Sequence, residues 1–361
     1  MIAALLVAAV CPFVPNATFG FYQWASTAPS DVLERTQEAL HRLHAGLVRI
    51  YLGPRYDYHS AVLAEGRQRL GPDEAWRQPH IRRLLDDPCI STVVLTAYPA
   101  RNYGSGPDDI NLNRPWSKLD EAAEYAQMFA LADGLYREYG QQARTFILAN
   151  SEADARLLEI ANYTGSLQDA LKNIIAWQRT RYRAVADARL KHAGARLRVL
   201  NAFEISLVNL EIVRDGGGFR HDTDGTVNAL TSIVPQVPFD ILSYSAYESI
   251  NSPFETGAID TPPAAITQRL VRDWRRLRRA TAKPIMIGEL GFSRREFDAL
   301  PTGGVTPRLD AALSALRRIR PAYTVLWQAF DGVRADGSSD GFGLLEAEGS
   351  AEAVIRKYLG Q

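Results

Sequence analysis

Short apolar runs recur along the chain, and longer stretches with helical periodicity separate them. Continuous apolar runs of this length are typical of strands buried on both faces of a parallel sheet. Eight runs are predicted to be strands: residues 19–24, 47–52, 92–97, 145–150, 197–203, 239–245, 284–289 and 323–328.

The intervening stretches carry the residues that usually mark helix boundaries. Ser117 and Asp120 have the spacing of a capping box, and Gly140 stands where a C-terminal glycine is expected. Thr306 and Pro307 predict a cap and a first-position proline for the last long helix. The predicted strands therefore alternate with predicted helices.

Eight strand–helix alternations without an internal break predict one closed (β/α)₈ barrel, the TIM-barrel fold, over residues 16–361. A doubly wound open sheet is the alternative, but no GxGxxG or P-loop pattern follows a predicted strand. Residues 1–15 begin with an apolar run too short to span a bilayer, so no integral membrane span is expected. We interpret them as a secretory signal or an N-terminal packing segment. We expect export to the periplasm or the extracellular space, with a cytoplasmic location as the alternative.

Charge and cysteine content narrow the classes of function. The 361 residues include 41 basic and 41 acidic side chains, and this balance argues against a nucleic-acid partner. The arginines within 275–279 are interpreted as a solvated helix face. Cys11 and Cys89 are the only cysteines, so we expect neither a disulfide framework nor a thiolate zinc site. Segments 222–225 and 336–341 resemble calcium loops faintly, but they lack the final glutamate and are interpreted as turns.

Functional side chains in such a barrel stand at the C-terminal ends of the strands, where the following loops meet. Carboxylates and aromatic rings predominate there, whereas no histidine or lysine is predicted at these ends. This argues against metal-dependent amidohydrolases and Schiff-base aldolases. Two carboxylates flanking a sugar are what cleavage of a glycosidic bond requires. The candidate residues, in chain order, are Trp24, Arg49, Tyr51, Tyr98, Asn150, Glu152, Glu204, Asn209, Tyr247, Glu289 and Trp327.

Several segments resemble those of clan A glycoside hydrolases, the cellulase-type and mannanase-type barrels. Segment 283–291, Lys-Pro-Ile-Met-Ile-Gly-Glu-Leu-Gly, is similar to the strand-seven nucleophile segment. Arg49 resembles the strand-two arginine, Trp327 the strand-eight tryptophan, and residues 341–345 the usual C-terminal ending. The resemblance covers nearly the whole barrel. It implies catalytic glutamates at the ends of strands four and seven, with Glu289 as the nucleophile.

One departure from the clan's pattern concerns the proton donor. The clan places Asn directly before its acid/base Glu, whereas Ser151 separates Asn150 from Glu152 here. Glu152 is the preferred acid/base, with the loop bulged by one residue. Glu204 on strand five is the alternative, and a chain without an acid/base is a third interpretation. The insertion also indicates a divergent family.

The other candidates have both a functional and a structural interpretation. Trp24 and Trp327 are expected to hold the sugar at the barrel mouth or to fill the mouth by packing. Tyr247 either donates a hydrogen bond to the nucleophile or packs in the core. Arg49 is expected to orient a carboxylate and to keep the nucleophile ionised. Glu204 binds substrate or pairs with a nearby arginine.

The expected function is hydrolysis of an oligo- or polysaccharide with retention of configuration, through a covalent glycosyl-enzyme. Glu289 attacks the anomeric carbon, and Glu152, whose pKa burial should raise, acts first as acid and then as base. The expected partner is a carbohydrate, and no metal or organic cofactor is expected. A non-catalytic carbohydrate-binding barrel and a transglycosylase are the alternatives. The sugar, the linkage and the oligomeric state are left open.

Overall fold

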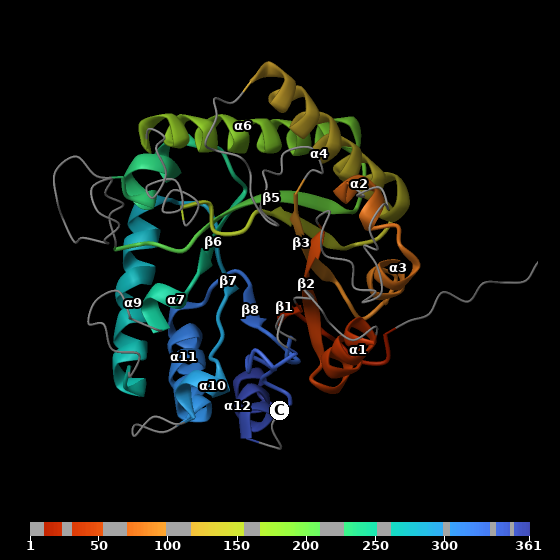
Figure 1. Ribbon diagram of the computed structural model, residues 1–361. Helices are drawn as coiled ribbons and strands as arrows, with labels where there is room; N and C mark the ends of the chain where they lie inside the picture. Colours follow the sequence, from red (N-terminus) through yellow and green to blue (C-terminus); the bar gives the residue numbers. More distant parts are fainter. Residues whose placement is uncertain are drawn as a thin grey trace, which may run out of the picture.

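Eight parallel strands form a closed barrel in the computed structural model, and helices surround it (Figure 1). Each strand pairs with its neighbours in chain order, and β8 pairs with β1 to close the barrel. The (β/α)₈ barrel predicted from the sequence is confirmed. The structure describes residues 11–23, 31–52, 71–98, 117–154, 167–209, 227–250, 261–298, 304–332, 337–346 and 350–361.

Every strand of the barrel coincides with one of the predicted apolar runs, and the bounds agree to within three residues. Helices on the outside and side chains on the inside bury both faces of the sheet, which explains why these runs are continuous rather than alternating. The strands are β1 Asn16–Gln23, β2 Ala45–Leu52, β3 Thr92–Ala97, β4 Thr145–Ala149, β5 Arg198–Ile205, β6 Ile241–Ser245, β7 Ile285–Glu289 and β8 Thr324–Trp327.

Long helices cover most of the outer surface of the barrel. They are α1 Val32–Arg42, α4 Lys118–Tyr139, α6 Leu167–Lys191, α9 Pro263–Ala280, α11 Val305–Ile319 and α12 Ser350–Leu359. The shorter helices are α2 Pro72–Ala75, α3 Pro79–Leu85, η1 Ala229–Ile233, η2 Val234–Gln236, α7 Tyr247–Ile250 and α10 Arg294–Phe297. Within the described ranges, no helix is long and apolar enough to cross a membrane.

The helix boundaries test the predicted caps. Ser117 caps α4 as predicted, because its hydroxyl accepts the N–H of Asp120 while the Asp120 carboxylate accepts the N–H of Ser117. Gly140 follows the last residue of α4, also as predicted. The prediction for α11 was wrong by two residues, since its cap is Gly304 and Pro307 lies at the third helical position. A proline is tolerated there because the first N–H groups of a helix have no partner within it.

The two cysteines overturn the expectation of no disulfide. Cys11 and Cys89 are bonded across a sequence separation of 78 residues, which ties the N-terminal segment to the stretch before β3. A cross-link over this separation restricts the unfolded chain and stabilises the fold by roughly 4–5 kcal/mol in the chain-entropy account. Two isolated cysteines form no spacing motif, so only the fold could bring them together.

Candidate active site

A buried arginine on β2 contacts three other strands, β3, β5 and β7, at the C-terminal end of the barrel. Arg49 of β2 donates from Nη1 to Glu204 Oε2 at 2.6 Å and from Nη2 to Glu204 Oε1 at 2.9 Å. Its Nε donates to Thr96 Oγ1 on β3 at 2.8 Å, and Nη1 also donates to the carbonyl of Gly288 on β7 at 3.0 Å. A bidentate arginine–carboxylate pair fixes the plane of both groups. Glu204 and Arg49 therefore have fixed orientations at the buried base of the site.

Glu289 lies beside this pair at the end of β7. Arg49 Nη2 is 3.4 Å from Glu289 Oε1. Burial raises the pKa of Glu289 well above its usual range, and the charges of Glu204 and Glu152 raise it further, whereas Arg49 and the Ser245 hydroxyl lower it. The expectation that Arg49 keeps Glu289 ionised is therefore correct in direction but not in net effect. Arg49 gives its shorter contacts to Glu204, and burial outweighs the attraction that is left.

Glu152 belongs to the same cluster of carboxylates. It follows β4 by three residues and is partly exposed, and its N–H lies 3.5 Å from Glu204 Oε1. Its charge acts on the ionisation of both Glu289 and Tyr247, so its side chain lies within electrostatic reach of both groups. Among the three clustered glutamates, Glu152 is the most accessible to solvent.

The inserted Ser151 has a defined place in the loop after β4. Its N–H donates to the Tyr98 hydroxyl at 2.6 Å, and its carbonyl accepts from that hydroxyl at 3.2 Å. Asn150, the preceding residue, accepts the N–H of Glu204 at 2.8 Å and donates to the Glu204 carbonyl at 3.1 Å. Asn150 thus joins β4 to β5 through the backbone, and Tyr98 holds the extra residue that precedes Glu152.

Tyr247, at the start of α7, lies among the charged groups of the site and is partly buried. Burial raises its pKa well above the usual value, and the charge of Glu289 is the next largest cause, followed by that of Glu152. A phenol with a raised pKa keeps its proton, so it acts as a hydrogen-bond donor. A donor to the nucleophile is one of the two roles predicted for Tyr247, and its role stays a prediction.

Trp327 offers an aromatic surface at the end of β8. It is partly exposed, and its ring meets the buried ring of Tyr22 edge-on with centroids 4.8 Å apart. The Arg49 guanidinium lies over the other ring of this pair, 4.2 Å from the Tyr22 centroid. Trp327 is thereby linked by packing to the charged cluster. Trp24, the other predicted sugar platform, lies outside the described residues, as does segment 222–225.

Tyr51 and Tyr98 lie deeper than a sugar-binding surface would require. They are 1% and 2% exposed, and their rings stack with centroids 5.8 Å apart. Tyr98 also stacks on Trp177 of α6. These rings pack the barrel wall beneath the site, and the described contact of Tyr98 with the loop after β4 runs through its hydroxyl.

Sequence analysis missed two small residues of the site, Ser243 and Gly288. Ser243 is the register partner of Glu204 on β6, and its hydroxyl donates to Glu204 Oε2 at 2.7 Å. A Cβ atom added at Gly288 would lie 2.1 Å from both that carboxylate oxygen and the Ser243 hydroxyl. Only glycine leaves room for the pair at this point. A polar or very small residue inside an apolar strand run is the pattern that could have indicated them.

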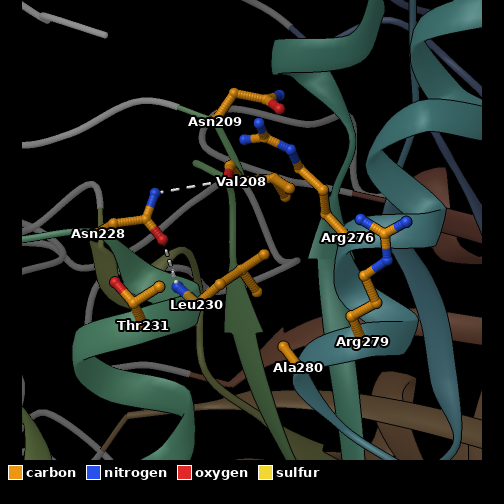
Figure 2. A pocket seen from close by; sticks show the side chains of 8 residues that line it. All are labelled: Val208, Asn209, Asn228, Leu230, Thr231, Arg276, Arg279 and Ala280. Atoms are coloured by element: carbon orange, nitrogen blue, oxygen red, sulfur yellow. Dashed lines mark hydrogen bonds between the residues drawn. The ribbon is translucent and has the colours of Figure 1, made fainter. Parts of the chain in front are cut away.

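Asn209 lies apart from this cluster. Its Nδ2 donates to Asp273 Oδ1 of α9 at 2.9 Å, and the residue lines a pocket of about 350 Å³ beside η1 and the C-terminal half of α9 (Figure 2). Its described contacts point away from the role in substrate binding that its place in the sequence predicts. The other lining residues described are Val208, Asn228, Leu230, Thr231, Arg276, Arg279 and Ala280.

One group of side chains has the composition of a metal site. His41, Asp87 and Cys89 place ligand atoms within 4.8 Å of one another, and it is the only such group found in the described ranges. The sulfur of Cys89 is bonded to Cys11, however, and the His41 ring nitrogen lies 2.6 Å from Asp87 Oδ2. The group is explained by a disulfide and a hydrogen bond beside it.

No family model matches the chain, and no curated protein matches it significantly. Its fold is similar to that of several solved enzymes over nearly the whole length. A hyperthermophilic β-glucosidase from Pyrococcus furiosus gives a TM-score of 0.58 at 10% identity, covering 96% of each chain. An endo-1,4-β-D-mannanase from Thermotoga petrophila RKU-1, solved with maltose and glycerol, gives 0.54 at 12% identity, covering 95% of this chain and 99% of that one. A GH5-4 broad specificity endoglucanase from Clostridium acetobutylicum gives 0.51 at 10% identity, covering 95% and 97%.

These structural neighbours are clan A glycoside hydrolases with an eight-stranded parallel barrel. The resemblance noted in short sequence segments therefore extends to the fold. At 10–12% identity the comparison establishes the fold alone, and the lack of a family match agrees with the divergence indicated by Ser151.

Proposed function

We propose that the chain is a glycoside hydrolase that cleaves an oligo- or polysaccharide with retention of configuration, through a covalent glycosyl-enzyme. The observation that carries the proposal is the carboxylate cluster, in which Glu289 lies 3.4 Å from Arg49, the N–H of Glu152 lies 3.5 Å from Glu204, and the charge of Glu152 acts on the ionisation of Glu289. Retaining hydrolysis requires two carboxyl groups on either side of the scissile bond, one to attack and one to move a proton. Both groups stand at strand ends, where barrel enzymes place their chemistry.

The hydrogen bonds of Glu204 support Glu152 as the acid/base. Glu204 is fully buried, and its oxygens accept two bonds from Arg49 and one from Ser243. Its oxygens are therefore already engaged by buried donors, and the side chain is poorly placed to reach a leaving group. Glu152 is partly exposed and therefore able to reach a glycosidic oxygen. We assign Glu204 the structural role of fixing Arg49.

In the proposed reaction Glu152 protonates the leaving oxygen while ionised Glu289 attacks the anomeric carbon. Glu152 then takes a proton from the water that releases the sugar. Glu289 holds its proton more readily than an isolated carboxyl does, because burial and the charges of Glu204 and Glu152 oppose its ionisation. Activity therefore requires a pH at which Glu289 has lost its proton and Glu152 still carries one. Tyr247, which keeps its own proton, stabilises Glu289 once it is ionised.

Two further features bear on the substrate and on the cellular location of the protein. Trp327 offers a partly exposed ring that packs on Tyr22, over which Arg49 lies, and the solved neighbours act on β-linked glucosides and mannans by name. We infer that the substrate is a β-linked saccharide. The Cys11–Cys89 disulfide supports export, because disulfides persist mainly in oxidising compartments.

The decisive experiment separates the roles of the two glutamates. Glu152→Ala should abolish hydrolysis of glycosides with poor leaving groups, whereas activated aryl β-glycosides should still form a glycosyl-enzyme that accumulates. Mass spectrometry of the protein should detect the added sugar, and azide should restore turnover by attacking in place of activated water. Glu138→Gln, at an exposed glutamate on α4 that binds Arg82, is the matched control and should behave as wild type.

The alternatives give different results in the same assay. A non-catalytic carbohydrate-binding barrel would bind saccharides without cleaving any substrate, before or after mutation. A transglycosylase would form the same glycosyl-enzyme but pass the sugar to an added saccharide in preference to water. If wild type is active yet Glu152→Ala never gains the mass of a sugar and azide restores nothing, Glu152 is not the acid/base.

A further inference from the structure

Four consecutive peptide N–H groups after β5 all donate to carboxylates from the two neighbouring loops. The first two belong to Ser206 and Leu207, and both donate to Asp154. Ser206 N lies 2.9 and 3.0 Å from the two Asp154 oxygens, Leu207 N lies 2.6 Å from Oδ2, and the Ser206 hydroxyl donates to Oδ1 at 3.2 Å. Asp154 is fully buried and stands two residues after Glu152.

The next two N–H groups are bound from the opposite side. Val208 N donates to Glu248 Oε2 at 2.5 Å, and Asn209 N lies 3.0 and 3.1 Å from the two oxygens of the same carboxylate. Glu248 is 2% exposed and directly follows Tyr247. The loop after β4 and the loop after β6 therefore hold the end of β5 between them.

We propose that Asp154 and Glu248 are positioning residues, which set the places of Glu152 and Tyr247 relative to the nucleophile by anchoring both loops to the end of β5. The inference rests on the proposed function, since it assigns a purpose to the anchoring only if Glu152 and Tyr247 act on a substrate.

Within the described part of the chain, no backbone carbonyl accepts these N–H groups. The pairing of β5 with β6 ends at Ile205, opposite Tyr244, so residues 206–209 lie beyond the strand ladder. A buried N–H without an acceptor is unfavourable, and a carboxylate satisfies two of them at once. Water or a longer strand could also satisfy these N–H groups. In this protein the acceptors are the side chains of Asp154, two residues after Glu152, and Glu248, directly after Tyr247.

A third connection strengthens the anchor on the side of α7. The Ser249 hydroxyl donates to Asp273 Oδ2 of α9 at 2.7 Å, and Asn209 Nδ2 donates to Oδ1 of the same carboxylate at 2.9 Å. Ser249, two residues after Tyr247, and Asn209, beyond the end of β5, thus share a partner on α9. A displacement of Glu248 would pass to Tyr247 through one peptide unit, and a displacement of Ser249 through two.

The test compares substrates whose leaving groups differ in their need for a proton. Asp154→Asn replaces one acceptor oxygen by an NH₂ group that faces N–H donors, so the loop after β4 should shift. Only proton delivery by Glu152 should suffer, and kcat/KM for a poor leaving group should fall about tenfold to hundredfold, the effect of roughly 1 Å of misplacement. For an activated aryl glycoside, kcat/KM should change by less than about threefold, because that leaving group departs without protonation.

Glu248→Gln should give the other pattern. Tyr247 acts on the nucleophile, which every substrate needs, so kcat/KM should fall by a similar factor of about tenfold for both leaving groups. Ser206→Ala removes only the hydroxyl bond to Asp154 and should repeat the Asp154→Asn pattern with a smaller fold-change. If Asp154→Asn does not fold, Ser206→Ala still tests the role of Asp154.

The matched control is Asp240→Asn at the opposite end of the barrel. Asp240 likewise accepts a backbone N–H, that of Asn201 at 2.8 Å, and it pairs with Arg189. This variant should lower thermal stability without altering the ratio of kcat/KM between the two substrates.

The outcomes distinguish a failure of the proposed function from a failure of the positioning roles. A wild-type chain without glycosidase activity overturns the proposed function and the positioning roles with it. An active wild type for which Asp154→Asn and Ser206→Ala leave the substrate ratio unchanged, as Asp240→Asn does, overturns the positioning role alone. A selective loss on the poor leaving group, absent from Glu248→Gln, supports both.

Discussion

The cluster around Arg49 and the pocket beside α9 differ in the solvent exposure of their charged side chains. Arg49 is fully buried and bound to two carboxylates, whereas Arg276 and Arg279 at the pocket are exposed to solvent. Figure 2 shows the Arg276 guanidinium directed toward Val208 and Asn209. Water screens an exposed charge, but a buried one shifts the ionisation of its neighbours. A hollow on the surface is therefore a weaker indication of chemistry than a set of buried charges that perturb one another.

The largest difference between the two regions should appear in turnover. Glu289→Gln keeps the shape of the side chain but removes the nucleophile, so kcat should fall by about 10⁴-fold or more. Arg276→Gln, at the pocket, should leave kcat within about twofold of wild type. Steady-state kinetics on an activated aryl β-glycoside measures both, with circular dichroism to establish that each variant is folded. Near wild-type turnover by Glu289→Gln would contradict the assignment.

Stability should separate the two regions next. Arg49→Ala leaves Glu204 fully buried without a counter-charge, and this should lower the free energy of unfolding by about 3–5 kcal/mol. Arg279→Ala removes an exposed charge and should change it by less than about 0.5 kcal/mol. Urea unfolding followed by fluorescence gives both values. Equal changes in the free energy of unfolding for the two variants would mean that the buried Arg49–Glu204 pair does not stabilise the fold.

Buried carboxylates should also make stability depend on pH. Burial raises the pKa of Asp154 to about 6 and that of Glu248 to about 7, even though backbone N–H groups oppose the rise. A carboxyl with a raised pKa in the folded state binds its proton more tightly there than in the unfolded chain. Its contribution is therefore present below the unfolded pKa of about 4 and is lost as pH rises through the folded pKa.

The expected size of this effect is about 3 kcal/mol for each group, from a shift of about two pKa units. The free energy of unfolding of wild type, minus that of Asp154→Asn, should fall by this amount between pH 4 and pH 7. The same comparison for Glu248→Gln should fall over a range that extends slightly higher. Arg276→Gln should run parallel to wild type at every pH, and a parallel line for Asp154→Asn would rule out its raised pKa.

The smallest effect is a shift of the pH–activity profile. Glu204 raises the pKa of Glu289 by its charge, and it also takes the shorter contacts of Arg49, which lowers that pKa. Glu204→Gln should therefore lower the pKa of Glu289, and the acid limb of kcat/KM should move to lower pH, because Glu289 must be ionised to attack. A shift to higher pH would show that another group controls this limb.

The order of elements and most of the strand ends could be predicted from the amino-acid sequence alone. Runs such as Thr92–Ala97 are buried on both faces, and this local property is visible in any window of the chain. Arg49 and Glu289 could be found for the same reason, since each interrupts or ends an apolar run. Ser117 and Asp120 predicted the start of α4 because a cap is formed by residues close in sequence.

The partners of these side chains depend on the folded barrel and could not be predicted from the sequence. Arg49 binds Glu204 more closely than Glu289, Asn209 turns to α9, and Cys11 meets Cys89, in each case across more than 60 residues of chain. The anchoring roles of Asp154 and Glu248 also depend on backbone N–H groups, which every residue except proline carries. Side-chain identity cannot indicate such a contact, because its geometry arises only when the barrel closes and brings neighbouring strand ends together.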